Sequence, residues 1–185
     1  MHDIEPFYNW RDLYIASEDE KSVFYGTQHS EFEYEHKVYN YYIHPQWDFF
    51  GSATLYLKLL FVDYEDGYAI MEFIGEWNDC LYNDIMFLKR DVIDKMIKRG
   101  ITKFILLVEN VLTFYASDDS YYEEWYDDIK DEEGWICFIN TSEHIEEEMK
   151  EIGLKHYVVF GGKYASLNWR KYEPENLFRF IDDSI

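Results

Sequence analysis

The chain has 185 residues and a formal net charge of −21, because 38 acidic residues outnumber 17 basic ones. This length suits one domain and is enough to build a hydrophobic core without disulfides or metals. Aromatic residues make up 21% of the chain, so we do not expect disorder despite the charge. A surface this negative repels phosphate groups, which argues against nucleic-acid binding and against docking on anionic membranes.

The sequence also favours a cytoplasmic protein. Its first residues are acidic and lack the apolar stretch of a secretory signal, and no segment approaches the roughly 18 apolar residues that span a bilayer. Cys80 and Cys137 form no CxxC motif, and both lie near apolar residues. We therefore expect two reduced thiols in the core.

Residues 1–52 are unusually rich in aromatic side chains and predict an extension that packs on the core. Within them, apolar and charged residues alternate over 31–38, a period of two that predicts a half-exposed strand. The histidines His29, His36 and His44 are spaced seven and eight residues apart, which fits no ordinary metal motif. We therefore predict neither a metal nor a cofactor.

From residue 53 onward, strand and helix patterns alternate. Residues 55–62 and 68–75 predict two antiparallel strands joined by an Asp-Gly turn. Residues 82–99 carry apolar side chains at spacings of three and four, which predicts a helix with one buried stripe. Gly100 is a natural residue to end that helix.

The remaining patterns predict three further strands with helices between and after them. Residues 103–108 and 135–139 are almost entirely apolar, which is typical of strands covered on both faces. Further elements are predicted as a last strand over 156–160 and helices over 117–133, 142–152 and from Pro174 onward. The order predicts an α/β fold over 53–185, a single unit whose mixed sheet begins with an antiparallel hairpin and continues as βαβαβα with parallel strands.

This order resembles the STAS domain, the family of sulphate transporters and anti-sigma-factor antagonists, over about 60–184. The similar parts are the strand 68–75 ending in glycine, the long helix, the strand 101–108 and the loop 109–114. The family continues with an Asp-Ser-Ser-Gly-Leu-like helix start whose serine is phosphorylated in signalling members. The matching stretch here, 115–122, lacks the Gly-Leu pair and contains additional acids.

The resemblance implies a regulatory domain and makes Ser117 and Ser120 candidates for phosphorylation. Both serines also suit a plain capping role, because Ser120 and Glu123 have the spacing of a capping box. A phosphate beside Asp118 and Asp119 crowds like charges. Crowding of that kind either provides a switch or disfavours the modification.

The strongest local feature is the segment 117–133, which holds nine carboxylates and one lysine. A solvated helix face explains such a run without any function. A docking site for a protein with a basic surface is the functional alternative, since aromatic residues interleave with the acids. The predicted contact residues are Asp118, Asp119, Tyr121, Tyr122, Glu123, Glu124, Trp125, Asp127 and Asp128.

Our leading hypothesis is a non-enzymatic, cytoplasmic protein-interaction or regulatory domain that docks a partner through 117–133. The alternative is a small-molecule-binding protein or enzyme with an aromatic pocket between the N-terminal extension and the sheet. Tyr42, Trp77 and Asp79 are the residues expected on the walls of that pocket. A third class, a mimic of nucleic acid, requires carboxylates in a double row, which a sequence cannot display.

Overall fold

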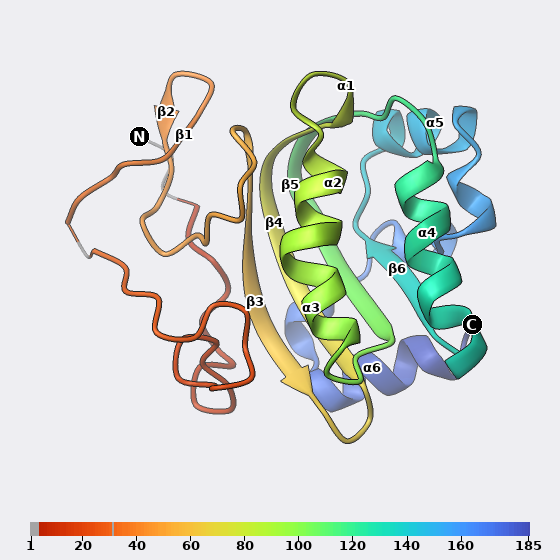
Figure 1. Ribbon diagram of the computed structural model, residues 1–185, viewed down its shortest axis with the longest axis horizontal. Helices are drawn as coiled ribbons and strands as arrows, with labels where there is room; N and C mark the ends of the chain where they lie inside the picture. Colours follow the sequence, from red (N-terminus) through yellow and green to blue (C-terminus); the bar gives the residue numbers. More distant parts are fainter. Residues whose placement is uncertain (1–3, 31) are drawn as a thin grey trace.

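The computed structural model describes residues 4–30 and 32–185. Its main sheet has four strands, in the order β3 (Leu55–Asp63), β4 (Tyr68–Asn78), β5 (Lys103–Tyr115) and β6 (Trp135–Ile139) (Figure 1). β3 and β4 are antiparallel, whereas β4, β5 and β6 run parallel to one another. This topology confirms the predicted mixed α/β sheet that begins with an antiparallel hairpin.

Both faces of the sheet are covered, which explains why β5 and β6 are so uniformly apolar. One set of alternating strand residues packs beneath the helices on the front face in Figure 1, and the other set packs against α6 behind the sheet. The front face is covered by α4 (Ser120–Ile129), α5 (Glu143–Glu151) and the helical segment 84–97, and the back face is covered by α6 (Pro174–Asp182). Pro174 occupies the first turn of α6, as its sequence predicts.

The predicted single helix over 82–99 is a composite element. It consists, in order, of α1 (Asp79–Tyr82), α2 (Asp84–Phe87), a π-helical stretch (Leu88–Ile93) and α3 (Asp94–Ile97). Asn83 adopts a left-handed conformation with φ of 53° and separates α1 from α2. The π-helical stretch widens the turn, and the side chain of Lys89 within it is fully buried. Sequence periodicity predicted the apolar stripe but not this break.

The prediction of a last strand over 156–160 is wrong, because this segment forms no regular strand. Leu154–His156 form a 3-10 turn, and the amide of Val158 donates to the carbonyl oxygen of Leu154. Only one parallel bridge, between Cys137 and Val159, joins this segment to β6. The backbone hydrogen bonds of the segment are used largely in the turn, so few remain for pairing with the sheet.

The N-terminal segment runs along the outer edge of β3, at the left of Figure 1. Helix α4 lies toward the opposite edge of the sheet, near β6. Of the strand predicted over 31–38, residue 31 lies outside the described residues. Only β1 (Lys37–Val38) pairs, with β2 (Tyr41–Tyr42) across a tight turn. A single antiparallel bridge between Asp48 and Leu57 ties this segment to β3.

The prediction that both thiols lie in the core is wrong for Cys80. Cys137 is buried in β6, whereas Cys80 is exposed because it lies in the short α1 beyond the end of β4. Within the described parts of the chain, no helix has the length and apolarity needed to cross a membrane.

Candidate functional site

The acidic run begins in the connection that leads from β5 to α4. The backbone amide and the hydroxyl of Ser120 both donate to Asp118 Oδ1, at 3.0 and 2.5 Å. These hydrogen bonds stabilise the ionised carboxyl and lower the pKa of Asp118. Ser120 is the first residue of α4. The predicted capping box between Ser120 and Glu123 is wrong, because the Ser120 amide donates to Asp118 and the Glu123 amide donates to the backbone oxygen of Asp119.

The inner face of α4 is part of the hydrophobic core. Tyr122, Trp125 and Ile129 are fully buried beneath the helix. Trp125 packs edge-on against Phe104 of β5, with ring centroids 5.1 Å apart. The prediction that Tyr122 and Trp125 contact a partner is thus corrected: their apolar rings fill the space between α4 and the sheet, so no partner can reach them.

A buried carboxyl group holds α4 to the end of β4. The hydroxyl of Tyr122 donates to Asp79 Oδ2 at 2.9 Å, and the amide of Ile85 donates to Asp79 Oδ1 at 2.8 Å. Burial raises the pKa of Asp79 to about 7, although both hydrogen bonds oppose the shift. This arrangement connects three elements, α1, α2 and α4, through one side chain.

The predicted pocket walls do not come together. Trp77 is fully buried in the core, Asp79 is engaged as described, and Tyr42 lies 40% exposed on the separate β1–β2 hairpin. Trp77 and Tyr122 are packed neighbours, with ring centroids 6.5 Å apart. Trp77 and Asp79 are therefore structural residues, and the prediction of a pocket lined by these three residues is wrong.

Two of the predicted contact carboxylates pair within the protein. The buried ammonium nitrogen of Lys89 lies 2.7 Å from Asp128 Oδ2 and also donates to Asp94. Burial opposes the charge of Lys89, but these hydrogen bonds prevail and raise its pKa. Arg90 forms a two-pronged pair with Glu124, at 2.5 and 2.7 Å, and this pair lowers the pKa of Glu124.

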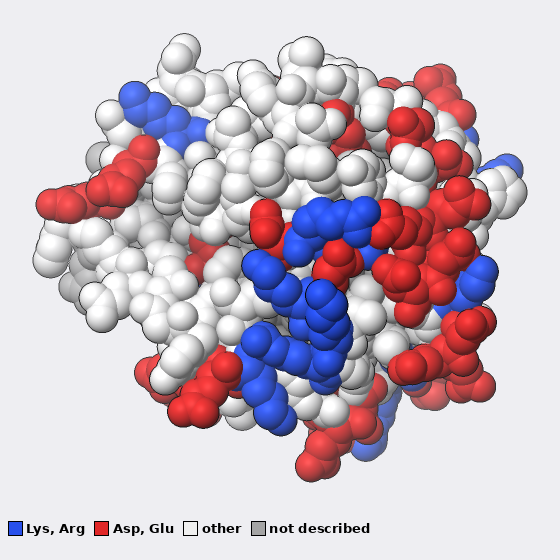
Figure 2. All heavy atoms as spheres, viewed as in Figure 1, with Lys and Arg blue, Asp and Glu red and all other residues white. Residues whose placement is uncertain are grey.

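The remaining carboxylates line the outer side of α4 and its two ends. Figure 2 shows them gathered over α4, beside a basic cluster over the helix formed by α2 and α3. We call this group the acidic surface; its members are Asp118, Asp119, Glu123, Asp127, Asp131, Glu132 and Glu133. Tyr121 and Tyr126 lie half-buried beside it. Asp127 also pairs with Lys130, and because both side chains are exposed this ion pair contributes little to stability.

Comparison with known proteins gives a match in structure alone. No family model matches the chain, and no curated protein matches it. The anti-sigma factor antagonist SpoIIAA in its unphosphorylated form superposes with a TM-score of 0.50 at 12% identity, covering 70% of this chain and 97% of that protein. SpoIIAA in its phosphorylated form, from Bacillus, gives 0.42 at 12% identity, over 58% and 92%. TM1081 of Thermotoga maritima gives 0.43 at 17% identity, over 69% and 88%.

The fold is STAS-like. Within this STAS-like fold, Ser117 and Ser120 lie in and just after the connection from β5 to α4, and both are exposed. They are thus accessible from solvent at the position where the sequence resemblance places a phosphorylated serine.

Sequence reasoning missed the two cations that organise this site. Lys89 and Arg90 follow Leu88 directly in the apolar stripe of the predicted helix. A lysine beside a buried stripe, in a chain with a concentrated acidic segment elsewhere, was the available signal. The π-helical widening that turns Lys89 inward leaves no mark in the hydrophobic period, because the residues on either side keep their spacing.

Proposed function

We propose that this chain is a non-enzymatic, cytoplasmic regulatory domain that binds a protein partner with a basic surface through α4. The observation that carries the proposal is the acidic surface itself. Its members Glu123 and Asp127 are exposed one helical turn apart, on the side of α4 that faces away from the sheet. Complementary charge speeds the encounter of two proteins and selects among partners.

The internal ion pairs support this proposal by separating two kinds of carboxylate. Asp94, Glu124 and Asp128 are matched by Lys89 and Arg90 and help to hold the helices together. The carboxylates of the acidic surface have no comparable role in packing. Structural ion pairs therefore explain only some of the carboxylates in the segment 117–133.

Aromatic side chains at the margin add contact area to the charge. Tyr121 lies next to Arg90, with the guanidinium carbon 5.4 Å from the ring centroid, and Tyr126 packs near Tyr157 at 6.2 Å. Tyrosine is enriched at protein interfaces because it combines apolar area with a hydroxyl. Tyr121 is one of the contact residues predicted from the sequence, and Tyr126 takes the place of the buried Tyr122 and Trp125.

The placement of α4 leaves it open to a partner. The N-terminal segment borders β3 at the far side of the sheet, so it does not cover α4 (Figure 1). SpoIIAA, whose fold the chain shares, is an anti-sigma factor antagonist with phosphorylated and unphosphorylated forms. A regulatory domain that acts by contact with another protein is consistent with that likeness.

Ser120 and Ser117 are the proposed phosphorylation sites next to this surface. The hydroxyl of Ser120 already donates to Asp118 Oδ1, so a phosphate there removes that hydrogen bond and adds about two negative charges. Mass spectrometry of protein purified from its native cells tests the proposal. Phosphate on a peptide containing Ser120 or Ser117, absent from the matching Ser→Ala variant, supports it, and phosphate on neither serine contradicts it.

Site-specific photo-crosslinking tests the docking proposal and captures the partner in the same experiment. A photoreactive amino acid replaces Glu123 on α4 or, as the matched control, the exposed Glu147 on α5. We expect one defined protein to crosslink from position 123 in cells and not from position 147. Equal crosslinking from both positions, or none from position 123, would contradict docking through α4.

A further inference from the structure

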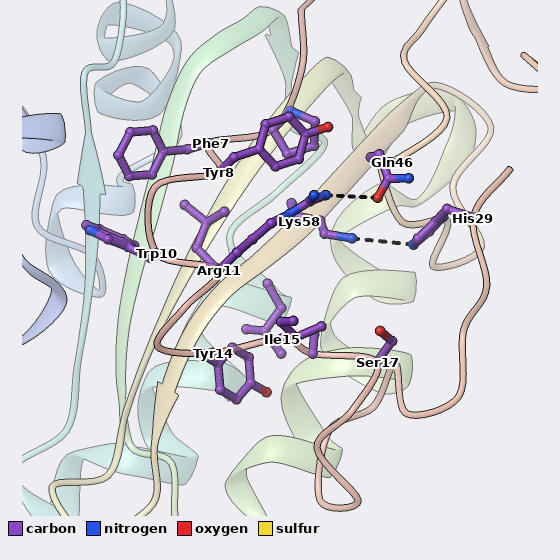
Figure 3. A pocket seen from close by; sticks show the side chains of 14 residues that line it. Phe7, Tyr8, Trp10, Arg11, Tyr14, Ile15, Ser17, His29, Gln46 and Lys58 are labelled. Atoms are coloured by element: carbon purple, nitrogen blue, oxygen red, sulfur yellow. Dashed lines mark hydrogen bonds between the residues drawn. The ribbon is translucent and has the colours of Figure 1, made fainter. Parts of the chain in front are cut away.

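A cavity of about 200 Å³ lies between the N-terminal segment and the outer edge of the sheet (Figure 3). Residues 6–17 form one side, and Lys58, Leu59 and Leu60 of β3 form the other. It lies in the region where the sequence predicted an aromatic pocket, but its lining residues differ from those expected. It is separated from the acidic surface by the width of the sheet (Figure 1).

The apolar walls of the cavity are fixed in place by the fold. Phe7 and Trp10 pack edge-to-face with ring centroids 5.1 Å apart, and Trp10 Nε1 donates to the carbonyl oxygen of Tyr172 at 3.2 Å. The amide of Phe7 donates to Glu72 Oε2 of the central strand β4 at 2.8 Å. Tyr14 is tied through its hydroxyl to Asp19 Oδ2 at 2.9 Å. The aromatic walls are therefore preformed.

The polar lining is cationic, which is unusual in a chain with a net charge of −21. Lys58 Nζ lies 3.2 Å from Asp48 Oδ2, and His29 Nε2 lies 2.7 Å from Asp48 Oδ1. Asp48 is buried, so the negative charge that matches Lys58 lies behind the lining of the cavity and not within it.

Arg11 brings a second positive charge to the lining, and its side chain is exposed to solvent. Its guanidinium carbon lies 3.8 Å from the centroid of the Tyr8 ring, and Nη2 donates to the neutral Gln46 side chain at 3.1 Å (Figure 3). Across residues 4–30 and 32–185, no carboxylate lies within ion-pair distance of Arg11. The planar guanidinium presents several donors that suit a carboxylate.

We propose that this cavity binds a small aromatic carboxylate with a single ring, whose acid group pairs with Arg11 beside Lys58. The volume supports this class, because a dry cavity of about 150 Å³ in a protein accommodates benzene. A nucleotide is too large for the space, and an uncharged apolar molecule leaves Arg11 unmatched. Tyr8 and Tyr14 in the lining offer ring faces and edges for stacking.

Benzoate is the probe, and benzamide is its neutral match in shape. Binding of each to the full chain is measured by ligand-observed NMR and by titration calorimetry. We expect benzoate to bind with an affinity at least about tenfold higher than that of benzamide, because benzamide lacks the charge-assisted hydrogen bonds. Absence of benzoate binding at about 10 mM, or equal binding of both probes, would overturn the proposal.

Two variants locate the binding site. Arg11→Gln removes the exposed charge without touching the core, and we expect it to weaken benzoate binding about tenfold. Ser17→Phe fills space at the edge of the cavity and is expected to weaken benzoate and benzamide alike. The control Arg179→Gln removes an exposed cation on α6 and should leave binding unchanged. Unchanged benzoate affinity in Arg11→Gln overturns the pairing of the acid group with Arg11, and unchanged affinity in Ser17→Phe overturns binding in this cavity.

Discussion

The buried ammonium nitrogen of Lys89 lies 2.7 Å from Asp128 Oδ2, so a cation from the π-helical stretch is held beneath the acidic helix α4. The same ammonium group also donates to Asp94 on its own helix. One ammonium group therefore pairs with two carboxylates and joins two neighbouring helices. This contact offsets part of the negative charge where α4 packs against the neighbouring helix.

Lys89→Met should destabilise the protein markedly. Methionine fits the buried space, but it leaves Asp94 and Asp128 without their shared partner, and Glu124 nearby adds repulsion. We expect the free energy of unfolding to fall by about 2 kcal/mol, because charge-assisted hydrogen bonds are lost while Asp94 and Asp128 stay partly open to water. Urea denaturation at pH 7 measures the change.

Lys95→Met provides the control for Lys89→Met. Lys95 pairs with Asp91 at 3.6 Å, but both side chains are about half exposed, so the loss should stay below about 1 kcal/mol. Equal effects of the two substitutions would show that the burial of Lys89 does not matter.

Asp79→Asn should stabilise the protein more at high pH than at low pH. Burial raises the pKa of Asp79 from its ordinary value of 3.8 to about 7, so the folded state binds this proton more tightly than the unfolded state does. The contribution of Asp79 to stability is therefore greatest below about pH 4 and is lost as the pH rises to about 7. Asparagine does not titrate, so the variant does not lose stability in this pH range, and its side-chain oxygen can still accept a hydrogen bond from the amide of Ile85.

The test compares unfolding free energies of the parent and Asp79→Asn at pH 5.5 and pH 8. We expect the stability advantage of the variant to grow by about 2 kcal/mol between these pH values. Asp131→Asn, which changes an exposed acid outside this network, should show no such growth. A constant difference between Asp79→Asn and the parent would contradict a raised pKa at Asp79.

Glu72→Leu should loosen the attachment of the N-terminal segment. Glu72 is buried, its pKa is raised to about 7 by that burial, and its Oε2 accepts from the amide of Phe7. Without this acceptor, hydrogen exchange at the amide of Phe7 should accelerate at least about tenfold, as expected for a hydrogen bond to a charged group. Glu72→Gln keeps an oxygen acceptor and should change the rate much less. Similar rates in all three proteins would show that the Phe7–Glu72 contact does not anchor the segment.

The sequence predicted the elements whose pattern reflects burial alone. The β3–β4 hairpin, the apolar strands β5 and β6, and the helix that begins at Pro174 all follow from hydrophobic period and turn chemistry. The break at Asn83 and the π-helical stretch were not predictable in this way, because the hydrophobic period does not register the hydrogen bonds of Asp79 and Asp84 around Asn83 or the contact of Lys89 with Asp128. The segment 156–160 shows the same limit, since its apolar residues pack against the core without forming a strand.

The candidate site shows a similar division between composition and geometry. The concentration of carboxylates over 117–133 is plain in the sequence, and the structure places seven of the nine on the outer side of α4 and at its two ends. Which aromatic residues are buried depends on the rotation of the helix, and this favours Tyr122 and Trp125 for the core. The pairing of Glu124 with Arg90 joins residues 34 positions apart, which no local pattern reveals.

The central claim is that the acidic surface binds a basic protein partner, and charge reversal tests it most directly. The affinity of the partner identified by crosslinking is measured for the parent, for Glu123→Lys/Asp127→Lys on α4, and for Glu143→Lys/Glu147→Lys on α5. Both pairs are exposed, begin in the first turn of their helix and are four residues apart, so the variants are matched in charge and position.

We predict that reversal on α4 weakens binding at least about tenfold, that reversal on α5 changes it less than about threefold, and that the affinity of the parent falls as salt is added. Equal effects of the two reversals, or an affinity that neither reversal nor salt alters, would contradict docking through the acidic surface.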